Sequence, residues 1–278
     1  MDRYVVAGNP VEHSQSPFIH ARFAAQTGQA LHYDRLLCPL DGFADTVRRF
    51  ADEGGRGCNV TVPFKFEAFD LAARRTDRAA LAGAANILRF DARDGWLADN
   101  ADGCGLVRDI ERNAERTLAG QRVLVVGAGG GAAGALGPLL AARPAQLVLA
   151  NRSVDKARAL AARHAAPARG ADVELRATGL ADCGEAFDVV VNASASSLQG
   201  AEVPVSPRVL RAGTLALDMM YGPAAAGFIG WAARHGAVGR DGLGMLVEQA
   251  GEAFFVWRGV RPDTAPVLAA LRAQEAGT

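Results

Sequence analysis

The sequence predicts an α/β protein built from two lobes. Short β-rich runs alternate with helical stretches through the first third of the chain. At Gln121 the pattern changes: continuous apolar runs now alternate with helices, and the first run leads into a glycine-rich turn. Continuous apolar strands are typical of a parallel sheet that helices cover on both faces. We therefore expect the lobes to meet near residues 103–120, where the pattern is helical.

The first lobe is predicted from short segments that turn residues separate. Strands are expected at 4–8, 32–38 and 57–64, and helices at 17–28 and 41–55. Pro17 begins the first helix and Gly28 ends it, which is the usual placement of these residue types. The third strand is expected to stop at Pro63, because proline cannot donate a ladder hydrogen bond. A hairpin is expected next, with strands at 85–90 and 94–99.

The second lobe is predicted to begin with a strand, a glycine-rich turn and an Ala/Leu helix, over residues 121–143. Its further strands are expected at 146–152, 172–177, 187–194 and 214–221. A long helical pattern, GMLVEQAGEAFFVWRG, then runs to Gly259.

Composition limits the kinds of partner. Half of the 278 residues are hydrophobic, so the chain can bury a sizeable core. Thirty basic residues balance thirty acidic ones, which argues against nucleic acid or an anionic membrane surface as the main partner. An anionic ligand must therefore meet a local cluster of donors, and we expect small-molecule ligands.

Metal-binding, disulfide and targeting patterns are not found in the sequence. The four cysteines lie far apart without a C-x-x-C pair, so we expect free thiols in a cytoplasmic protein: Cys38, Cys58, Cys104 and Cys183. The five histidines have no metal-ligand spacing, and we expect no metal. The opening MDRYVVAGNP carries charges and a polar turn, unlike a signal peptide. No apolar run approaches the roughly 20 residues that a membrane span needs.

The strongest local motif is VLVVGAGGGAAG, which follows an apolar strand and opens a helix. Glycines allow the tight turn and let backbone N–H groups approach a pyrophosphate at the N-terminus of the helix. The motif predicts dinucleotide binding, and the alternative is a glycine-rich packing turn. The residues expected to contact the cofactor are Gly127, Ala128, Gly129, Gly130 and Gly131.

The end of the next strand indicates which nucleotide binds. NAD-binding proteins usually place an acidic side chain there to hold the ribose hydroxyls. This chain instead has Asn151, Arg152 and Ser153, with Lys156 behind them. A cation at this place suits the 2′-phosphate of NADP, whereas the alternative is a solvated surface arginine.

Two charged residues in the first lobe are candidates for chemistry. Lys65 follows NVTVPF and lies between two phenylalanines, and the alternative is an exposed lysine between core aromatics. Asp102, in NADG, precedes a helix whose first N–H groups would stabilise a carboxylate, although the motif could be a simple turn. In GNPVEHSQSP, Ser14 and Ser16 present two hydroxyls just before Pro17, which a purely chain-reversing loop would not need.

Read in order, the motifs resemble those of the shikimate dehydrogenase family over essentially the whole chain. The matching segments are GNPVEHSQSP, NVTVPFK, GAANIL, NADGCG, GAGGGAAG, NRS, NASAS, DMMYGP and GLGMLVEQA. The resemblance implies a reversible, NADPH-dependent reduction of 3-dehydroshikimate to shikimate on the way to chorismate. It also implies a substrate-binding α/β lobe and a Rossmann-like NADP-binding lobe separated by a cleft. Residues 1–103 and 239–278 would form the former, and 104–238 the latter.

The resemblance also assigns roles to individual residues. Lys65 and Asp102 would be the catalytic pair, because hydride arriving at a carbonyl carbon leaves negative charge on its oxygen, and an ammonium stabilises that charge. The substrate carboxylate would be held by Ser14, Ser16 and Tyr221. The ring hydroxyls would be bound by Thr61, Asn86 and Gln249 together with the catalytic pair.

Some positions depart from the family pattern. Alanine or isoleucine replaces the usual polar or basic residue at Ala21, Ile87, Ala101 and Ala133, and the NATS strand end reads NASA. These departures keep open a quinate/shikimate dehydrogenase paralogue with a relaxed substrate range or with NAD as its cofactor. A non-catalytic NADP-binding sensor is a further alternative, although such a protein would not need both Lys65 and Asp102. For the quaternary structure we expect a monomer or a homodimer.

Overall fold

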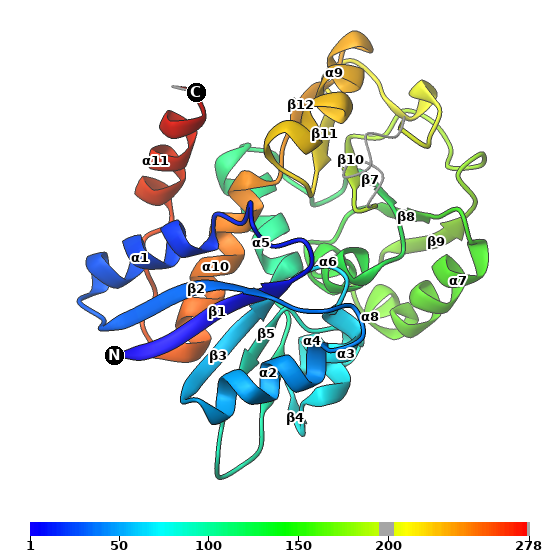
Figure 1. Ribbon diagram of the computed structural model, residues 1–278. Coiled ribbons are helices and arrows are strands. Elements are labelled where there is room, and N and C mark those ends of the chain that lie inside the picture. The colour runs from blue at the N-terminus through cyan, green and yellow to red at the C-terminus, as the bar shows by residue number, and fades with distance from the viewer. Residues whose placement is uncertain (195–202, 277–278) are drawn as a thin grey trace. The chain divides into compact units, whose positions relative to one another are not determined.

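The chain forms two compact units, each built around its own six-stranded sheet. The structure is a computed structural model that describes residues 1–194 and 203–276, so the last residues of the NASAS run lie outside the described part. One unit comprises Met1–Gly105 and Leu246–Thr278, and the other comprises Leu106–Met245 (Figure 1). The first unit is therefore made from both ends of the chain.

The sheet of the first unit is mixed. Its strands are β1 (Asp2–Gly8), β2 (Leu31–Leu37), β3 (Gly55–Val60), β4 (Arg74–Arg75), β5 (Ile87–Arg89) and β6 (Leu97–Asp99). They lie in the order β2-β1-β3-β5-β6-β4. Strand β1 pairs parallel with β2 and β3, whereas β5 pairs antiparallel with β3 and β6. The predicted hairpin is thus present as β5 and β6.

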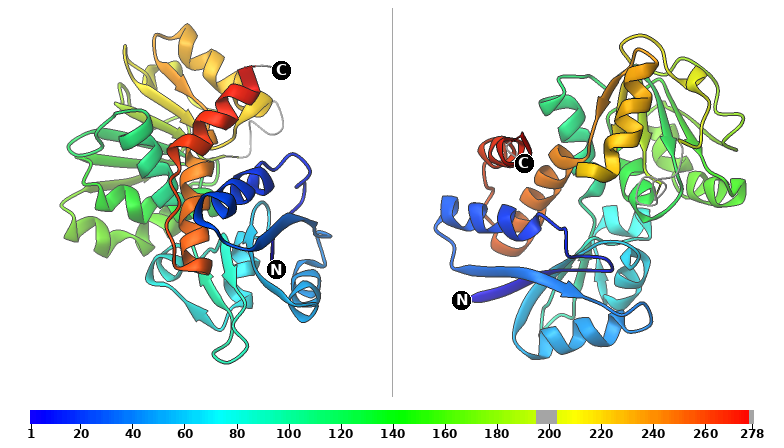
Figure 2. Two further views of the ribbon diagram at one scale, coloured as in Figure 1. Left: turned by 90° about the vertical axis from the view of Figure 1, so that its left-hand side faces the viewer. Right: turned by 45° about the horizontal axis from the view of Figure 1, so that its top comes forward.

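Alternation along β1 gives this sheet two apolar faces. Val5 and Ala7 pack with residues of α2 (Phe43–Asp52), whereas Tyr4 and Val6 face the opposite way, toward Trp257. Trp257 belongs to α10 (Leu243–Arg258), and α1 (Ser16–Thr27) and α11 (Ala265–Ala276) lie near it (Figures 1 and 2). Two short helices complete the unit: α3 (Lys65–Leu71) and α4 (Asp77–Ala82).

Several predicted elements end earlier than expected, and two of them lie directly beside Lys65 or Asp102. The third strand stops at Val60 rather than Pro63, because the chain turns over the next residues and Lys65 already begins α3. The helical pattern predicted near residues 103–120 is α5 (Asp102–Arg108) followed by a π-helical turn (Asp109–Asn113), and the helix ends there.

The sheet of the second unit is entirely parallel, as predicted. Its strands are β7 (Arg122–Val126), β8 (Gln146–Ala150), β9 (Glu174–Thr178), β10 (Val189–Asn192), β11 (Leu215–Asp218) and β12 (Val238–Arg240). The order is β12-β11-β10-β7-β8-β9, so the chain reverses its direction of travel across the sheet at β7. In open α/β sheets, ligands bind at the carboxyl ends of the strands beside such a reversal.

Helices cover both faces of this parallel sheet. They are α6 (Gly130–Ala141), α7 (Val154–Arg163), α8 (Ala165–Gly170) and α9 (Ala226–Arg234), with short 3₁₀ turns at Pro207–Val209 and Gly222–Ala225. Consecutive residues Val123, Leu124 and Val125 are all fully buried, which is possible only when both faces are covered. Phe228 and Trp231 of α9 pack on one of these faces.

A buried ion pair lies in the second unit, beside the start of α10. Asp109 is fully buried, and the Arg240 guanidinium donates to its two oxygens at 2.7 and 3.2 Å. Asn113 donates to the same carboxylate at 3.0 Å. A Cβ atom on Gly244 would overlap that carboxylate, so only glycine fits there.

Among the described residues, no helix is both long and apolar enough to cross a membrane.

Candidate active site

The first residue of α3 and the first residue of α5 form a close ion pair. The Lys65 ammonium lies 2.6 Å from Oδ2 of Asp102. The Asp102 side chain is 1% exposed and that of Lys65 is 15% exposed, so the pair is nearly sealed from water and Lys65 is its more accessible member. A buried carboxylate needs such a partner, because an unpaired charge in the interior is strongly destabilising.

Asn86 connects this pair to α10. Its amide nitrogen donates to Oδ1 of Asp102 at 2.9 Å and to Oε1 of Gln249 at 2.8 Å. Its amide oxygen accepts the backbone N–H of Ala101 at 2.8 Å. The structure thus brings Lys65, Asp102, Asn86 and Gln249 into one network, which we call the pair network. Both amide hydrogens of Asn86 are used within it, so a ligand hydroxyl would have to approach its oxygen or displace Gln249.

The two predicted serines lie together at the start of α1. The Ser14 hydroxyl donates to the Ser16 hydroxyl at 3.1 Å and accepts the Ser16 backbone N–H at 3.3 Å. The Arg35 guanidinium donates to the carbonyl of Ser14 at 2.6 and 3.2 Å, which fixes the loop to β2. Thr61 lies elsewhere in the unit, in the turn between β3 and α3.

Tyr221 belongs to the second unit, where it precedes the 3₁₀ turn Gly222–Ala225 and is half-buried. The structure therefore places this residue in a different unit from the two serines.

The glycine-rich loop follows β7, beside the reversal of the sheet. Gly127 has φ +115°, and a Cβ atom there would lie 2.9 Å from the carbonyl carbon and oxygen of Ala193. Both facts require glycine. Gly129 caps α6 and is exposed, and Gly130 and Gly131 form the helix's first turn, with Ala128 before them. Unpaired N–H groups at this end of a helix suit a phosphate.

The residues after β8 are accessible. Asn151 donates to the carbonyl of Ser153 at 2.9 Å, and Ser153 precedes α7. Arg152 is exposed, and within residues 1–194 and 203–276 its guanidinium makes no hydrogen bond or ion pair. Among the residues of these two ranges, its side chain therefore has no hydrogen bond or ion pair that an anion would have to break.

A second buried chain of polar groups, beneath the pair network, was missed in the sequence. Tyr33 donates to Oδ1 of Asn59 at 2.7 Å, and Asn59 donates to the backbone carbonyl of Asn86 at 3.3 Å. His20 stacks on Tyr33 with ring centroids 4.2 Å apart. Burial lowers the pKa of His20 to about 3, against a smaller opposing effect of the Asn59 amide, and burial raises the pKa of Tyr33. The sequence signal for these buried polar groups is Asn59, an asparagine within an apolar strand.

Three of the four substituted positions in the family pattern are buried. Ile87 and Ala101 are fully buried and pack with Ala253 of α10. Ala133 is 2% exposed inside α6, whereas Ala21 is exposed on α1. Ile87 of β5 and Ala101, which directly precedes α5, therefore contribute to an apolar contact with α10.

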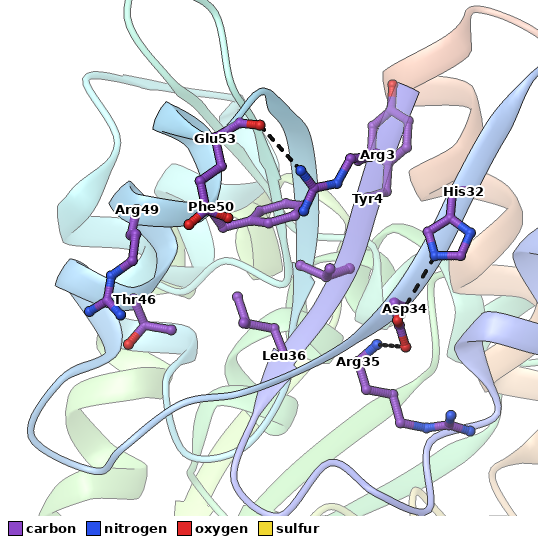
Figure 3. A pocket seen from close by; sticks show the side chains of 11 residues that line it. Arg3, Tyr4, His32, Asp34, Arg35, Leu36, Thr46, Arg49, Phe50 and Glu53 are labelled. Carbon is purple, nitrogen blue, oxygen red and sulfur yellow. Dashed lines mark hydrogen bonds and ion pairs between the residues drawn. The ribbon is translucent and has the colours of Figure 1, made fainter. Parts of the chain in front are cut away.

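A separate hollow lies on the α2 side of the first sheet (Figure 3). It has a volume of about 350 Å³, and it is lined by Arg3, Tyr4, Val5, His32, Asp34, Arg35, Leu36, Thr46, Arg49, Phe50 and Glu53. The Arg3 guanidinium lies over the Phe50 ring and donates to the Glu53 carbonyl at 3.2 Å. None of the predicted site residues lines this hollow, so it is not the candidate site.

Three family profiles match the chain in sequence order. The profile for the shikimate dehydrogenase substrate binding domain matches residues 6–88. The profile for shikimate/quinate 5-dehydrogenase matches 109–203, and that for the shikimate 5'-dehydrogenase C-terminal domain matches 242–272. The NADP(+)-dependent shikimate dehydrogenase of Methylibium petroleiphilum is 67% identical over 98% of this chain and 94% of its own length. The chain belongs to the shikimate dehydrogenase family.

Solved structures agree with this family assignment. The Ael1 enzyme from Pseudomonas putida is 46% identical, with TM-score 0.87 and 98% of each chain covered. The shikimate 5-dehydrogenase of Thermus thermophilus, in complex with NADP(H) and shikimate, is 26% identical, with TM-score 0.83 over 98% of this chain and 99% of its own. The predicted family and the predicted two-lobed α/β fold are confirmed.

Proposed function

We propose that the chain catalyses the reversible reduction of 3-dehydroshikimate to shikimate with NADPH, as a step toward chorismate. The observation that carries this proposal is the Lys65–Asp102 pair, held at 2.6 Å and tied to Asn86 in a member of the shikimate dehydrogenase family. The predicted activity, enzyme class and cofactor agree with those of relatives that are 59 to 67% identical and are named NADP(+)-dependent shikimate dehydrogenases.

Lys65 and Asp102 are proposed to be the catalytic pair. When bound, NADPH supplies the hydride that goes to the C3 carbonyl carbon. The Lys65 ammonium donates its proton to the carbonyl oxygen as negative charge develops there, and in the reverse direction the amine takes the proton back. Asp102 holds the ammonium and orients it. Asn86 holds the other oxygen of Asp102 at 2.9 Å, which restricts rotation of the carboxylate.

The remaining site residues are proposed to bind and orient the substrate. Ser14 and Ser16 offer hydroxyls from one loop to the carboxylate, with Tyr221 as a further donor. Thr61, Asn86 and Gln249 are proposed to recognise the ring hydroxyls. Residues 1–103 and 239–278 would then act as the substrate-binding domain, and 104–238 as the dinucleotide-binding domain.

The second unit contains groups that fit NADP. The backbone at Gly127 has φ +115° and passes so close to Ala193 that a Cβ would collide, so glycine makes the tight turn that precedes α6. The residues proposed for this contact are Gly127, Ala128, Gly129, Gly130 and Gly131. Arg152, flanked by Asn151 and Ser153, is proposed to bind the 2′-phosphate, because its guanidinium can form paired, charge-assisted hydrogen bonds.

A spectrophotometric assay of the purified protein tests the function. Shikimate and quinate are each offered with NADP or NAD, and Lys65→Ala, purified identically, controls for contaminating dehydrogenases. We expect the shikimate–NADP combination to have the highest kcat/KM. Preferred turnover of quinate, or equal use of NAD, would favour the relaxed paralogue. Nucleotide binding without turnover of either substrate would identify a non-catalytic sensor.

Location and assembly are also proposed. All four cysteines are free thiols, which suits the reducing cytoplasm. We propose a monomer or a homodimer, which sedimentation equilibrium of the purified protein would distinguish.

A further inference from the structure

Arg78, in α4, contacts two nearly buried carboxylates from different parts of the first unit. Its Nε and Nη2 atoms donate to the two oxygens of Asp99, each at 2.6 Å. Its Nη1 atom donates to Oε1 of Glu252 at 3.2 Å. The Asp99 and Glu252 side chains are only 3% and 7% exposed. The planar guanidinium thus bridges the end of β6 and the middle of α10.

Asp99 lies three residues before Asp102, the proposed catalytic carboxylate, so the Arg78–Asp99 contact holds the chain next to Asp102. Asp99 also accepts the hydroxyl of Thr76 at 2.6 Å and the backbone N–H of Asn100 at 2.7 Å. The Asn100 side chain in turn donates to the Ala84 carbonyl at 2.9 Å and accepts the backbone N–H of Asp102 at 3.1 Å. The position of Asp102 is therefore set by a rigid strand end that Arg78 holds.

The Glu252 contact leads to the other end of the pair network. Glu252 lies three residues after Gln249 on α10, so the two side chains project from the same side of the helix. Arg261 holds the second oxygen of Glu252 at 2.8 Å. Asn86 can bond Asp102 and Gln249 together only while β6 and α10 keep their spacing, since its donors reach them at 2.9 and 2.8 Å.

We propose that Arg78 is a positioning residue for the reaction: it clamps the end of β6 to α10 and thereby aligns Asp102 and Gln249 on Asn86. This inference rests on the proposed function. Arginine is needed because its fork meets Asp99 with two donors while a third reaches Glu252, which the single ammonium of lysine cannot do. Displacing catalytic groups by about 1 Å can cost roughly a hundredfold in rate.

Arg78→Lys is the decisive variant, because it keeps a positive charge beside both carboxylates and so favours folding. We expect kcat per folded molecule to fall about tenfold or more, as follows from losing alignment. The folded fraction is measured by circular dichroism. Arg78→Met, which also removes the charge, should lower kcat further.

A double-mutant cycle separates positioning from general stability. If Arg78 acts by aligning Gln249, then Arg78→Lys should cost much less kcat/KM in a Gln249→Ala background than in the wild type. Arg74→Lys is the matched control, because Arg74 pairs with Asp91 at 2.7 Å in the same unit and does not contact the pair network. We expect it to leave kcat unchanged.

Three results would overturn the proposal: wild-type kcat per folded molecule in Arg78→Lys, strictly multiplicative losses in the cycle, or an equal loss in Arg74→Lys. These are distinguishable from failure of the proposed function. In that case the wild-type protein itself would not turn over shikimate with NADP, whatever residue stands at position 78.

Discussion

The two units differ in how many hydrogen bonds their proposed ligand-binding side chains already make within the protein. In the first unit, Lys65, Asp102, Asn86 and Gln249 hold one another through hydrogen bonds of 2.6 to 2.9 Å. In the second unit, the proposed nucleotide contacts are the backbone of a loop that is buried at Gly127 and exposed at Gly129, and the exposed Arg152, which makes no hydrogen bond or ion pair in the described part of the chain.

This difference distinguishes the groups proposed to carry out the reaction from the groups proposed to select the nucleotide. The reacting groups are preorganised, so little reorganisation is needed when charge develops. The nucleotide contacts after β8 lie at the surface, so they can change without disturbing the core. Substitutions in the pair network should therefore alter both stability and turnover, whereas substitutions after β8 should alter cofactor preference alone.

The largest effect is expected from Lys65→Ala. Removing the ammonium takes away the proposed proton donor and should lower kcat about a hundredfold or more. It also leaves the nearly buried Asp102 without its cationic partner. Steady-state kinetics of the folded variant provides the measurement, and added alkylamine should restore part of the rate. Wild-type turnover in a folded Lys65→Ala protein would remove Lys65 from the mechanism.

A matched pair of asparagine substitutions compares the two units directly. Asn86→Ala leaves the Ala101 N–H and two side-chain acceptors without their partner, so we expect unfolding to become easier by about 2 to 3 kcal/mol. Asn151→Ala removes one exposed hydrogen bond to Ser153 and should change stability by less than about 0.5 kcal/mol. Urea unfolding of both variants tests this, and equal losses would contradict the comparison.

Arg152→Ala should affect the nucleotide alone. Charge-assisted hydrogen bonds contribute about 1.5–3 kcal/mol, so the preference for NADP over NAD should fall roughly ten- to hundredfold. The unfolding free energy and the KM for shikimate should stay near wild type. Arg158→Ala, which changes an exposed arginine on α7 paired with Asp155, is the control. An unaltered NADP preference in Arg152→Ala would assign the 2′-phosphate to another residue.

His20 represents a third case, because it is buried without a conventional hydrogen bond at either ring nitrogen in the described residues. Its pKa is about 3 in the folded protein because burial disfavours the charged ring, against 6.5 in the unfolded chain. The unfolded chain therefore binds a proton between these values, and stability is lost as the pH falls from about 6.5 toward 3.

His20→Phe should remove this pH dependence. At pH 5 the contribution of His20 is about 2 kcal/mol, since each pKa unit corresponds to about 1.36 kcal/mol. We expect the loss of unfolding free energy between pH 7 and pH 5 to be about 2 kcal/mol smaller in the variant. Denaturant unfolding at both pH values measures these losses. Identical losses in the two proteins would show that His20 takes up a proton as readily in the folded state as in the unfolded chain.

Features that depend on neighbouring residues in the sequence were predictable, whereas contacts between residues far apart in the sequence were not. The parallel sheet was predictable because consecutive apolar residues such as Val123 and Leu124 report burial locally. The contact between Arg78 and Glu252 joins residues 174 positions apart, and nothing near either residue indicates it. Asn86 was predicted as a ligand-binding residue, whereas its bonds to Asp102 and Gln249 required the three-dimensional arrangement. The roles of the individual site residues stay predictions.

The close approach of Gly244 to the Asp109 carboxylate restricts which substitutions the chain can accept during evolution. A side chain could enter at position 244 only if residue 109 became smaller, because the Asp109 carboxylate already fills that space. A smaller residue at 109 would in turn remove the acceptor of the Arg240 guanidinium. Each single replacement is therefore deleterious in the background of the other two. Across diverging relatives, positions 109, 240 and 244 should be retained together or exchanged together.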